Sequence, residues 1–151
     1  MLTLSLVALV TLASSLVLID IMDEVTFSSL VKRGSAIARS AATPAAYSIL
    51  ADDRLALDNL AVRLKESQDD LVYVAILDQK GTILAHDRVG RVGSSLRAPS
   101  GPALEGGENF SLYRVRREGQ ETFEVRAPVT FADKAIGHVV VGIDTKTLAA
   151  A

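Results

Sequence analysis

The chain opens with an unbroken apolar segment, Met1 to Ile19, which carries no charged side chain. About 20 such residues are what a helix needs to cross the ~30 Å hydrocarbon core of a bilayer. The pattern therefore predicts a transmembrane helix over residues 1–22. A cleaved signal peptide is the alternative, but the basic start and the small-residue cleavage site of such peptides are missing here. Charge does not decide the orientation, because no Lys or Arg precedes the segment.

Apolar residues recur at intervals of three and four over residues 23–50, which predicts that the helix continues beyond the membrane. This stripe can pack on the rest of the domain or on the same helix of a second copy. We expect Pro44 to bend or break the helix near Thr43, because proline lacks an N–H and restricts its predecessor. A second amphipathic helix is predicted from Asp52 to Gln68. The stripe consists of Phe27, Leu30, Val31, Ile37, Ala38, Ala41 and Ala45.

After Asp70, short β-branched runs alternate with turn residues, a pattern typical of an antiparallel sheet. Gly81 can supply the positive φ that closes the first hairpin. A long connection, Arg88 to Asn109, separates the second and third strands, and loops of this length are usually functional or mobile. The prediction is an α+β domain with helices on one face of a five-stranded antiparallel sheet and a pocket under the loop. The predicted strands are residues 71–77, 82–87, 110–117, 121–129 and 136–143.

Composition narrows the classes of function. With 16 Lys and Arg against 18 Asp and Glu, no overall field draws the chain onto nucleic acid, so we expect no nucleic-acid partner. The chain has no cysteine and only two histidines, which excludes disulfides and sulfur-bound zinc. No nucleophile, base and orienting group recur at a recognised spacing, and no glycine pattern matches a phosphate loop. We therefore expect a protein with no catalytic residues, no metal and no cofactor.

Three stretches carry a family resemblance: YVAILDQKGTILAH, RVGSSL and RAPVTFADKAIGHVVVGID. They resemble the extracytoplasmic Cache domains with a single PAS-like unit, which are sensors of bacterial histidine kinases, chemoreceptors and cyclases. The first stretch is similar to the family's strand, Asp–Gly turn and second strand, followed by a basic and glycine-containing segment. The last is similar to its penultimate strand ending in Ala-Pro and its final apolar strand. Together with the helices, the resemblance covers nearly the whole chain.

The resemblance implies a sensor domain on the periplasmic side of the cytoplasmic membrane, between the first helix and a second span. It implies a PAS-like sensor domain at residues 51–146, a membrane-proximal signalling helix at residues 23–50 and an exit toward the second span at residues 147–151. It also implies a small-molecule ligand, often a carboxylate or amino acid, and a homodimer paired through the helix. The cytoplasmic transmitter would lie outside this chain. A PAS-like dimerisation or protein-docking module without a small ligand is the alternative.

Candidate ligand-binding residues follow from the predicted strand register. If the first hairpin closes around residues 78–81, Tyr73 opposes His86 on one face of the sheet. Arg88 follows at the strand end, where its guanidinium can offer paired donors to a carboxylate. These residues predict a clamp for a small anion. The alternative is that Tyr73 packs its ring while His86 caps a turn.

Arg126 and Tyr113 complete the candidate set, and four other basic residues are given structural interpretations. Arg126 interrupts a strand-like run and is either a pocket cation or an exposed residue. Tyr113 can join the pocket with its polar tip or lie on the surface. The run Arg114, Arg116 and Arg117 is interpreted as a solvated strand edge, since edge charges prevent unwanted strand pairing. His138, in the most apolar strand, is expected to be a hydrogen-bonded core histidine.

Overall fold

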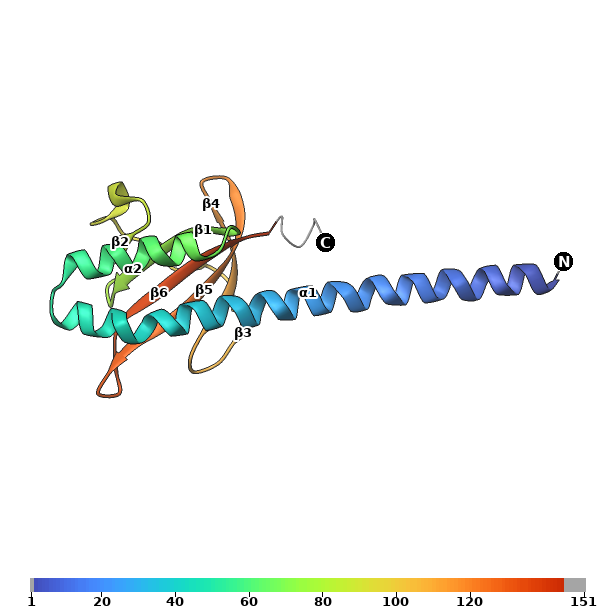
Figure 1. Ribbon diagram of the computed structural model, residues 1–151, viewed down its shortest axis with the longest axis horizontal. Coiled ribbons are helices and arrows are strands. Elements are labelled where there is room, and N and C mark those ends of the chain that lie inside the picture. The colour runs from blue at the N-terminus through green and yellow to red at the C-terminus, as the bar shows by residue number, and fades with distance from the viewer. Residues whose placement is uncertain (1, 146–151) are drawn as a thin grey trace.

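The computed structural model describes the backbone of residues 2–145 and the side chains of residues 7, 8, 10 and 27–145. Helix α1 (Leu2–Leu50) is long, and only its C-terminal part lies against the rest of the domain (Figure 1). Helix α2 (Arg54–Ser67) runs back alongside that part. Asp53 caps α2, because its side chain accepts a hydrogen bond from the backbone N–H of Ala56 at 3.1 Å.

Pro44 lies inside α1 without ending it, so the expected break near Thr43 is wrong. Pro44 and Ser40 both lie on the exposed side of the helix. The Ser40 carbonyl, which loses its N–H partner to the proline, can therefore bond to water instead. The helix continues to Leu50, and Asp52, with φ 52°, turns the chain into α2.

Within residues 2–145, six strands form one antiparallel sheet in the order β2-β1-β6-β5-β4-β3. Five of them correspond to the predicted strands. The sixth is a two-residue strand inside the long connection, which the five-strand prediction lacks. The α+β, PAS-like architecture with helices on one face is otherwise confirmed. The strands are β1 (Leu71–Asp78), β2 (Ile83–His86), β3 (Glu105–Gly106), β4 (Ser111–Arg117), β5 (Gln120–Phe131) and β6 (Lys134–Asp144).

The helices bury their apolar stripe against their own sheet. Ala38, Ala41 and Ala45 of α1 are fully or almost fully buried in the main core, and Phe27 meets Phe123 of β5 edge to face at 5.8 Å. The helix approaches the sheet closely at Gly34, where an added Cβ would lie 2.8 Å from Cδ1 of Ile143. Of the two options that the sequence left open, packing on the domain is the one that the structure shows.

The first hairpin has a different register from the one expected. His86 pairs with Ala75 instead of Tyr73, and Leu77 pairs with Ile83 instead of Thr82. A turn in which Asp78 and Thr82 are bonded, plus an irregularity between Ile76 and Leu77, accounts for the shift. The shift is one residue at Leu77 and two residues at His86, and a shift of two keeps His86 on the face that Tyr73 shares. Gly81 has φ 85°, as the turn prediction requires.

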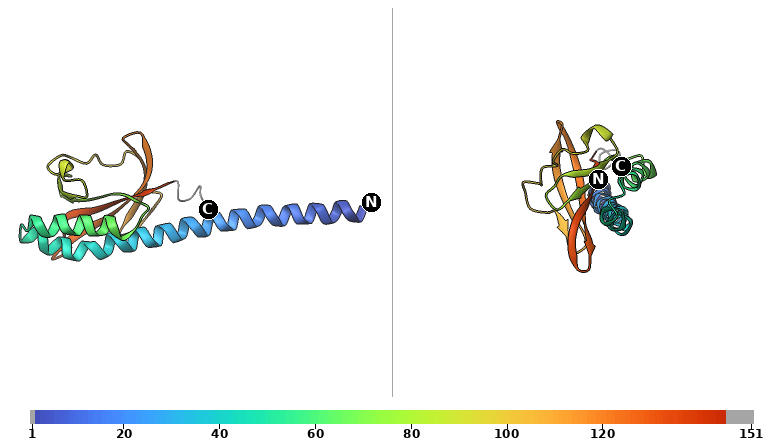
Figure 2. Two further views of the ribbon diagram at one scale, coloured as in Figure 1. Left: turned by 45° about the horizontal axis from the view of Figure 1, so that its top comes forward. Right: turned by 90° about the vertical axis from the view of Figure 1, so that its left-hand side faces the viewer.

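The connection after β2 folds over the sheet face opposite the helices (Figure 2). It contains the short 3-10 helix η1 (Val89–Arg91) and then runs alongside β2. The N–H of Ile83 donates to the carbonyl of Ser94 at 2.8 Å, and the N–H of Leu96 donates to the carbonyl of Gly81 at 3.0 Å. These bonds hold the loop in place as one wall of a cavity.

The predicted membrane span, residues 1–22, falls mostly on residues whose side chains lie outside the described part of the chain. Over the residues that the structure describes, no helix has a stretch long and apolar enough to cross a membrane. The predicted exit at residues 147–151 also lies outside the described residues.

Candidate ligand-binding pocket

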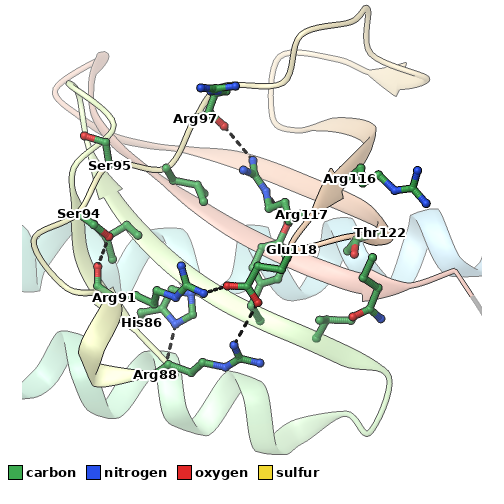
Figure 3. A pocket seen from close by; sticks show the side chains of 15 residues that line it. His86, Arg88, Arg91, Ser94, Ser95, Arg97, Arg116, Arg117, Glu118 and Thr122 are labelled. Atoms are coloured by element: carbon green, nitrogen blue, oxygen red, sulfur yellow. Dashed lines mark hydrogen bonds and ion pairs between the residues drawn. The ribbon is translucent and has the colours of Figure 1, made fainter.

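A cavity of about 370 Å³ lies between the helix-free face of the sheet and the loop after β2 (Figure 3). This volume is within the usual range for small-molecule sites. The described residues that line it include one carboxylate, Glu118, and five arginines. A cavity wall with this excess of guanidinium groups favours an anion. The arginines are Arg88, Arg91, Arg97, Arg116 and Arg117.

Glu124 of β5 is fully buried and is bonded to two residues that line the cavity, Tyr73 and Arg117. Its Oε1 accepts hydrogen bonds from the Tyr73 hydroxyl at 2.5 Å and from Nε of Arg117 at 2.7 Å. Its Oε2 accepts from Nε of Arg126 at 2.9 Å. Burial by itself raises the pKa of Glu124, but the bond from Arg117 and the charge of Arg126 outweigh burial and hold the pKa below its ordinary value. Glu124 is therefore an ionised anchor for two arginines.

Tyr73 is held between this buried carboxylate and β6. Burial, together with the charge of Glu124, raises the pKa of Tyr73 far above its ordinary value, so the phenol stays neutral and donates. The ring lies over Gly142 of β6, where an added Cβ would come within 2.4 Å of Cε1 of Tyr73. Only glycine leaves room for the ring at this place.

His86 forms the next part of the wall. Its ring stacks with Tyr73, with centroids 6.4 Å apart and an interplanar angle of 19°. Its Nδ1 accepts the backbone N–H of Arg88 at 2.9 Å, which leaves Nε2 to carry the proton of the neutral ring. Burial lowers the pKa of His86 from 6.5, and Arg88 and Arg91 act in the same direction against the opposing charge of Asp87. His86 is thus a neutral hydrogen-bond donor near pH 7.

Arg117 and Arg126 connect the loop to the buried carboxylate. Nη2 of Arg117 donates to the Arg97 carbonyl at 2.9 Å, and Nη2 of Arg126 donates to the same oxygen at 3.4 Å. Both guanidinium groups therefore bridge Glu124 and the backbone of the loop. The arrangement fixes the distance between the sheet and the loop that covers it.

Three of the five predicted site residues, Tyr73, His86 and Arg88, line the cavity together. Tyr73 and His86 meet as neighbours on one face, although they are not directly opposite each other as predicted. Tyr113 and Arg126 are not among the lining residues. Tyr113 is half-buried opposite Glu124 on the neighbouring strand, and Arg126 is held by Glu124. The ligand-binding roles of these residues stay predictions.

The sequence reasoning missed Arg117 and Glu124. Interpreting Arg117 as a solvated strand edge is wrong, because its side chain is only 20% exposed and contacts Glu124. One signal was available: Thr122, Glu124 and Arg126 alternate along an otherwise apolar strand, so they share a face. The expected core position of His138 is also wrong, since this side chain is half-buried on β6.

Within the described residues, no group of three or more His, Asp or Glu side chains is placed to hold a metal ion. Besides Glu118 and Gln120, the polar lining of the cavity consists of arginine, histidine, tyrosine, serine and threonine side chains. Such groups donate hydrogen bonds and positive charge, and they suit reversible binding of an anion.

The fold is similar to those of bacterial sensor domains. The DcuS sensor domain of E. coli superimposes with a TM-score of 0.64 at 17% identity, covering 82% of this chain and 94% of that one. The sensor domain of the V. cholerae histidine kinase DctB gives a TM-score of 0.51 at 15% identity, covering 69% of this chain and 43% of that one. The ligand-binding domain of the Pseudomonas fluorescens chemoreceptor CtaA, solved with L-isoleucine, gives a TM-score of 0.44 at 16% identity, covering 64% of this chain and 38% of that one.

At these identities the DcuS and DctB structures establish a shared fold and nothing finer. No curated protein sequence matches the chain. The family model for single Cache domain 3, in contrast, matches residues 22–151, which include the C-terminal part of α1, all of α2 and the whole sheet. The resemblance drawn from the strand and turn motifs is thereby confirmed, and the chain belongs to the single Cache domain 3 family.

Proposed function

We propose that this chain is the extracytoplasmic, ligand-sensing input domain of a membrane signal-transduction receptor and that it binds a small carboxylate. The observation that carries the proposal is the cavity, whose described lining has five arginines against one carboxylate. A carboxylate matches the planar donor pair of a guanidinium, and the two form parallel charge-assisted hydrogen bonds. The proposal gives the chain a binding role and no catalytic one.

The residues at the cavity divide into two sets. Arg88, which precedes η1, and Arg91, at its end, have half-exposed side chains that can reach a ligand in the cavity. His86 adds a neutral donor beside them. Tyr73, Arg117 and Glu124, in contrast, are bonded to one another beside the cavity. A bonded wall that faces exposed cations is a suitable arrangement for a sensor that closes on its ligand.

The alternative is a dimerisation or docking module without a small ligand. A filled interior between the sheet and the loop would support that alternative. The open volume of about 370 Å³ with converging polar groups supports sensing.

The proposed topology assigns the membrane span to residues 1–22 and the signalling helix to residues 23–50. The sensor domain is residues 51–146, and residues 147–151 lead toward a second span and a cytoplasmic transmitter outside this chain. What supports this order is the uncharged apolar segment at Met1–Ile19 and the continuity of α1 from Leu2 to Leu50. A continuous helix can transmit a displacement of the domain along its axis.

Calorimetric titration of the full chain in detergent with acetate, succinate and citrate tests the binding proposal. At least one carboxylate should bind, and Arg88→Ala or Arg91→Ala should weaken its binding roughly ten- to hundredfold. Arg63→Ala is the matched control, because Arg63 is an exposed arginine of α2 on the helix side of the sheet. Equal affinities for all four proteins, with folding verified by circular dichroism, would place the ligand elsewhere. Binding of none of the three carboxylates would contradict the ligand class.

A further inference from the structure

We propose that Glu118 is a resident carboxylate that occupies the ligand's position between Arg88 and Arg91, and that ligand binding displaces it. This inference rests on the proposed function and adds a regulatory element to the same site. Oε2 of Glu118 lies 3.6 Å from Nη1 of Arg88, and its Oε1 contacts Nη2 of Arg91. Figure 3 shows both guanidinium groups pointing toward this one carboxylate. Each oxygen thus meets a different arginine, as the oxygens of a bound carboxylate ligand would.

Glu118 reaches the pocket from a different element than the arginines do. It lies at the tip of the β4–β5 hairpin, where Glu118 (φ 53°) and Gly119 (φ 78°) form a tight turn. Arg88 and Arg91 belong to the loop after β2. The ion pairs therefore join two walls of the cavity, and separating them would let the walls move relative to each other.

The contact is weak enough for a ligand to replace it. The side chains of Glu118, Arg88 and Arg91 are 57%, 58% and 48% exposed. Ion pairs exposed to this degree contribute little, because water and salt screen them. The buried pairs that Glu124 makes with Arg117 and Arg126 are different, since both arginines are at most 20% exposed. A ligand should displace Glu118 and leave Glu124 in place.

Displacement has two consequences. A neutral ligand cannot replace the charge of Glu118 and would leave Arg88 and Arg91 paired as they are, so the site selects for anions. The hairpin also contacts the C-terminal end of β6, because the Thr145 hydroxyl donates to the carbonyl of Glu121 at 3.2 Å. Release of Glu118 therefore frees an element that is bonded to the end of the last strand.

Titration of the full chain in detergent with succinate tests this inference. Glu118→Gln should bind succinate about three- to tenfold more tightly than the unmodified chain, because an internal competitor is gone. Glu121→Gln is the matched control: it removes the same charge from the same hairpin, but its partner Arg114 does not line the cavity. Its affinity should be unchanged. Glu118→Asp keeps the charge but shortens the side chain, which draws the carboxylate away from Arg88 and Arg91. This variant should therefore also bind succinate more tightly.

The possible outcomes are distinct. If the unmodified chain binds succinate and Glu118→Gln binds equally or more weakly, the resident-carboxylate inference is wrong and the proposed function stands. If Glu121→Gln gains as much as Glu118→Gln while Glu118→Asp gains nothing, the effect is general electrostatics and the inference is again wrong. If succinate binds to Glu118→Gln and to none of the other proteins, the inference is supported. In that case the Glu118 carboxylate competes with succinate strongly enough to keep the affinity of the unmodified chain below detection. Absence of binding in every protein, with acetate and citrate as well as with succinate, contradicts both proposals.

Discussion

At the scale of single residues, the buried carboxylate of Glu124 holds the sheet side of the pocket together. Its two oxygens accept from Tyr73, Arg117 and Arg126, and its side chain has no exposed surface. Removing one partner of a buried ion pair leaves the other charges uncompensated. Replacing Glu124 would leave Arg117 and Arg126 largely buried without a counter-charge, which destabilises the fold.

Glu124→Gln should therefore lower the free energy of unfolding by about 3–5 kcal/mol. Urea denaturation measures this loss. Glu121→Gln is the control on the same strand, because its ion pair with Arg114 is half-exposed, and it should change stability by about 0.5 kcal/mol or less. Equal effects of the two substitutions would contradict the structural role of Glu124.

The two histidines should make the free energy of unfolding depend on pH. Burial lowers the pKa of both His86 and His138 from 6.5. A group with a lowered pKa in the folded protein stabilises the fold above its unfolded pKa, because the unfolded chain takes up the proton first as the pH falls. The free energy of unfolding should thus be constant near pH 7 and should fall below about pH 6.5.

Denaturation series between about pH 7.5 and about pH 5 measure this slope. The double variant His86→Gln, His138→Gln should have a flatter profile over the same range. Glu124 has a lowered pKa as well, so its contribution should be lost only at lower pH, below the ordinary carboxyl value of 4.5. Stability that rises from pH 7 to pH 5 would contradict the direction of these shifts.

At the scale of elements, α1 has two different faces. Leu30, Ala38 and Ala41 are buried against the domain's own sheet, so the apolar stripe is not available to a second copy. Lys32, Ala36, Arg39 and Thr43 lie on the exposed side at helical spacing. If the chain forms the homodimer that the family resemblance implies, paired through this helix, the exposed face must make the contact.

Single cysteines introduced along α1 test this pairing without interference, because the chain has no cysteine. Ala36→Cys and Thr43→Cys should form disulfides between copies in membranes. Ala38→Cys is the buried control and should not cross-link. Cross-links at the buried position alone, or at none of the three, would contradict pairing through the exposed face of α1.

The pattern of β-branched and turn residues was sufficient to predict five strands and both helices, because each has enough residues to show its period. A two-residue strand such as β3 has no period to detect. The first register was missed because a bulge adds a residue without a signal in the sequence. The bond between Arg117 and Glu124 was missed because it depends on the exact position of a hairpin, which local patterns do not give.

At the scale of the whole molecule, the N-terminal segment decides where the domain works. If residues 1–22 span the membrane, the expressed chain should sediment with membranes and its N-terminal sequence should start at the beginning of the chain. Leu9→Arg combined with Leu12→Arg should release it, since each charge at the middle of a span costs about 2.5–3.5 kcal/mol. A mature protein that begins after about residue 22 would show cleavage of a signal peptide instead.

The proposed function requires that the cavity between the sheet and the loop after β2 binds a carboxylate. Backbone amide NMR of the full chain in detergent, titrated with succinate, can locate the ligand residue by residue. We expect saturable shifts that concentrate in residues 86–97 and 116–122, which supply most of the lining, with little change in α2. Saturable shifts concentrated in α2 and the outer face of α1, with none around the cavity, would contradict the proposed function.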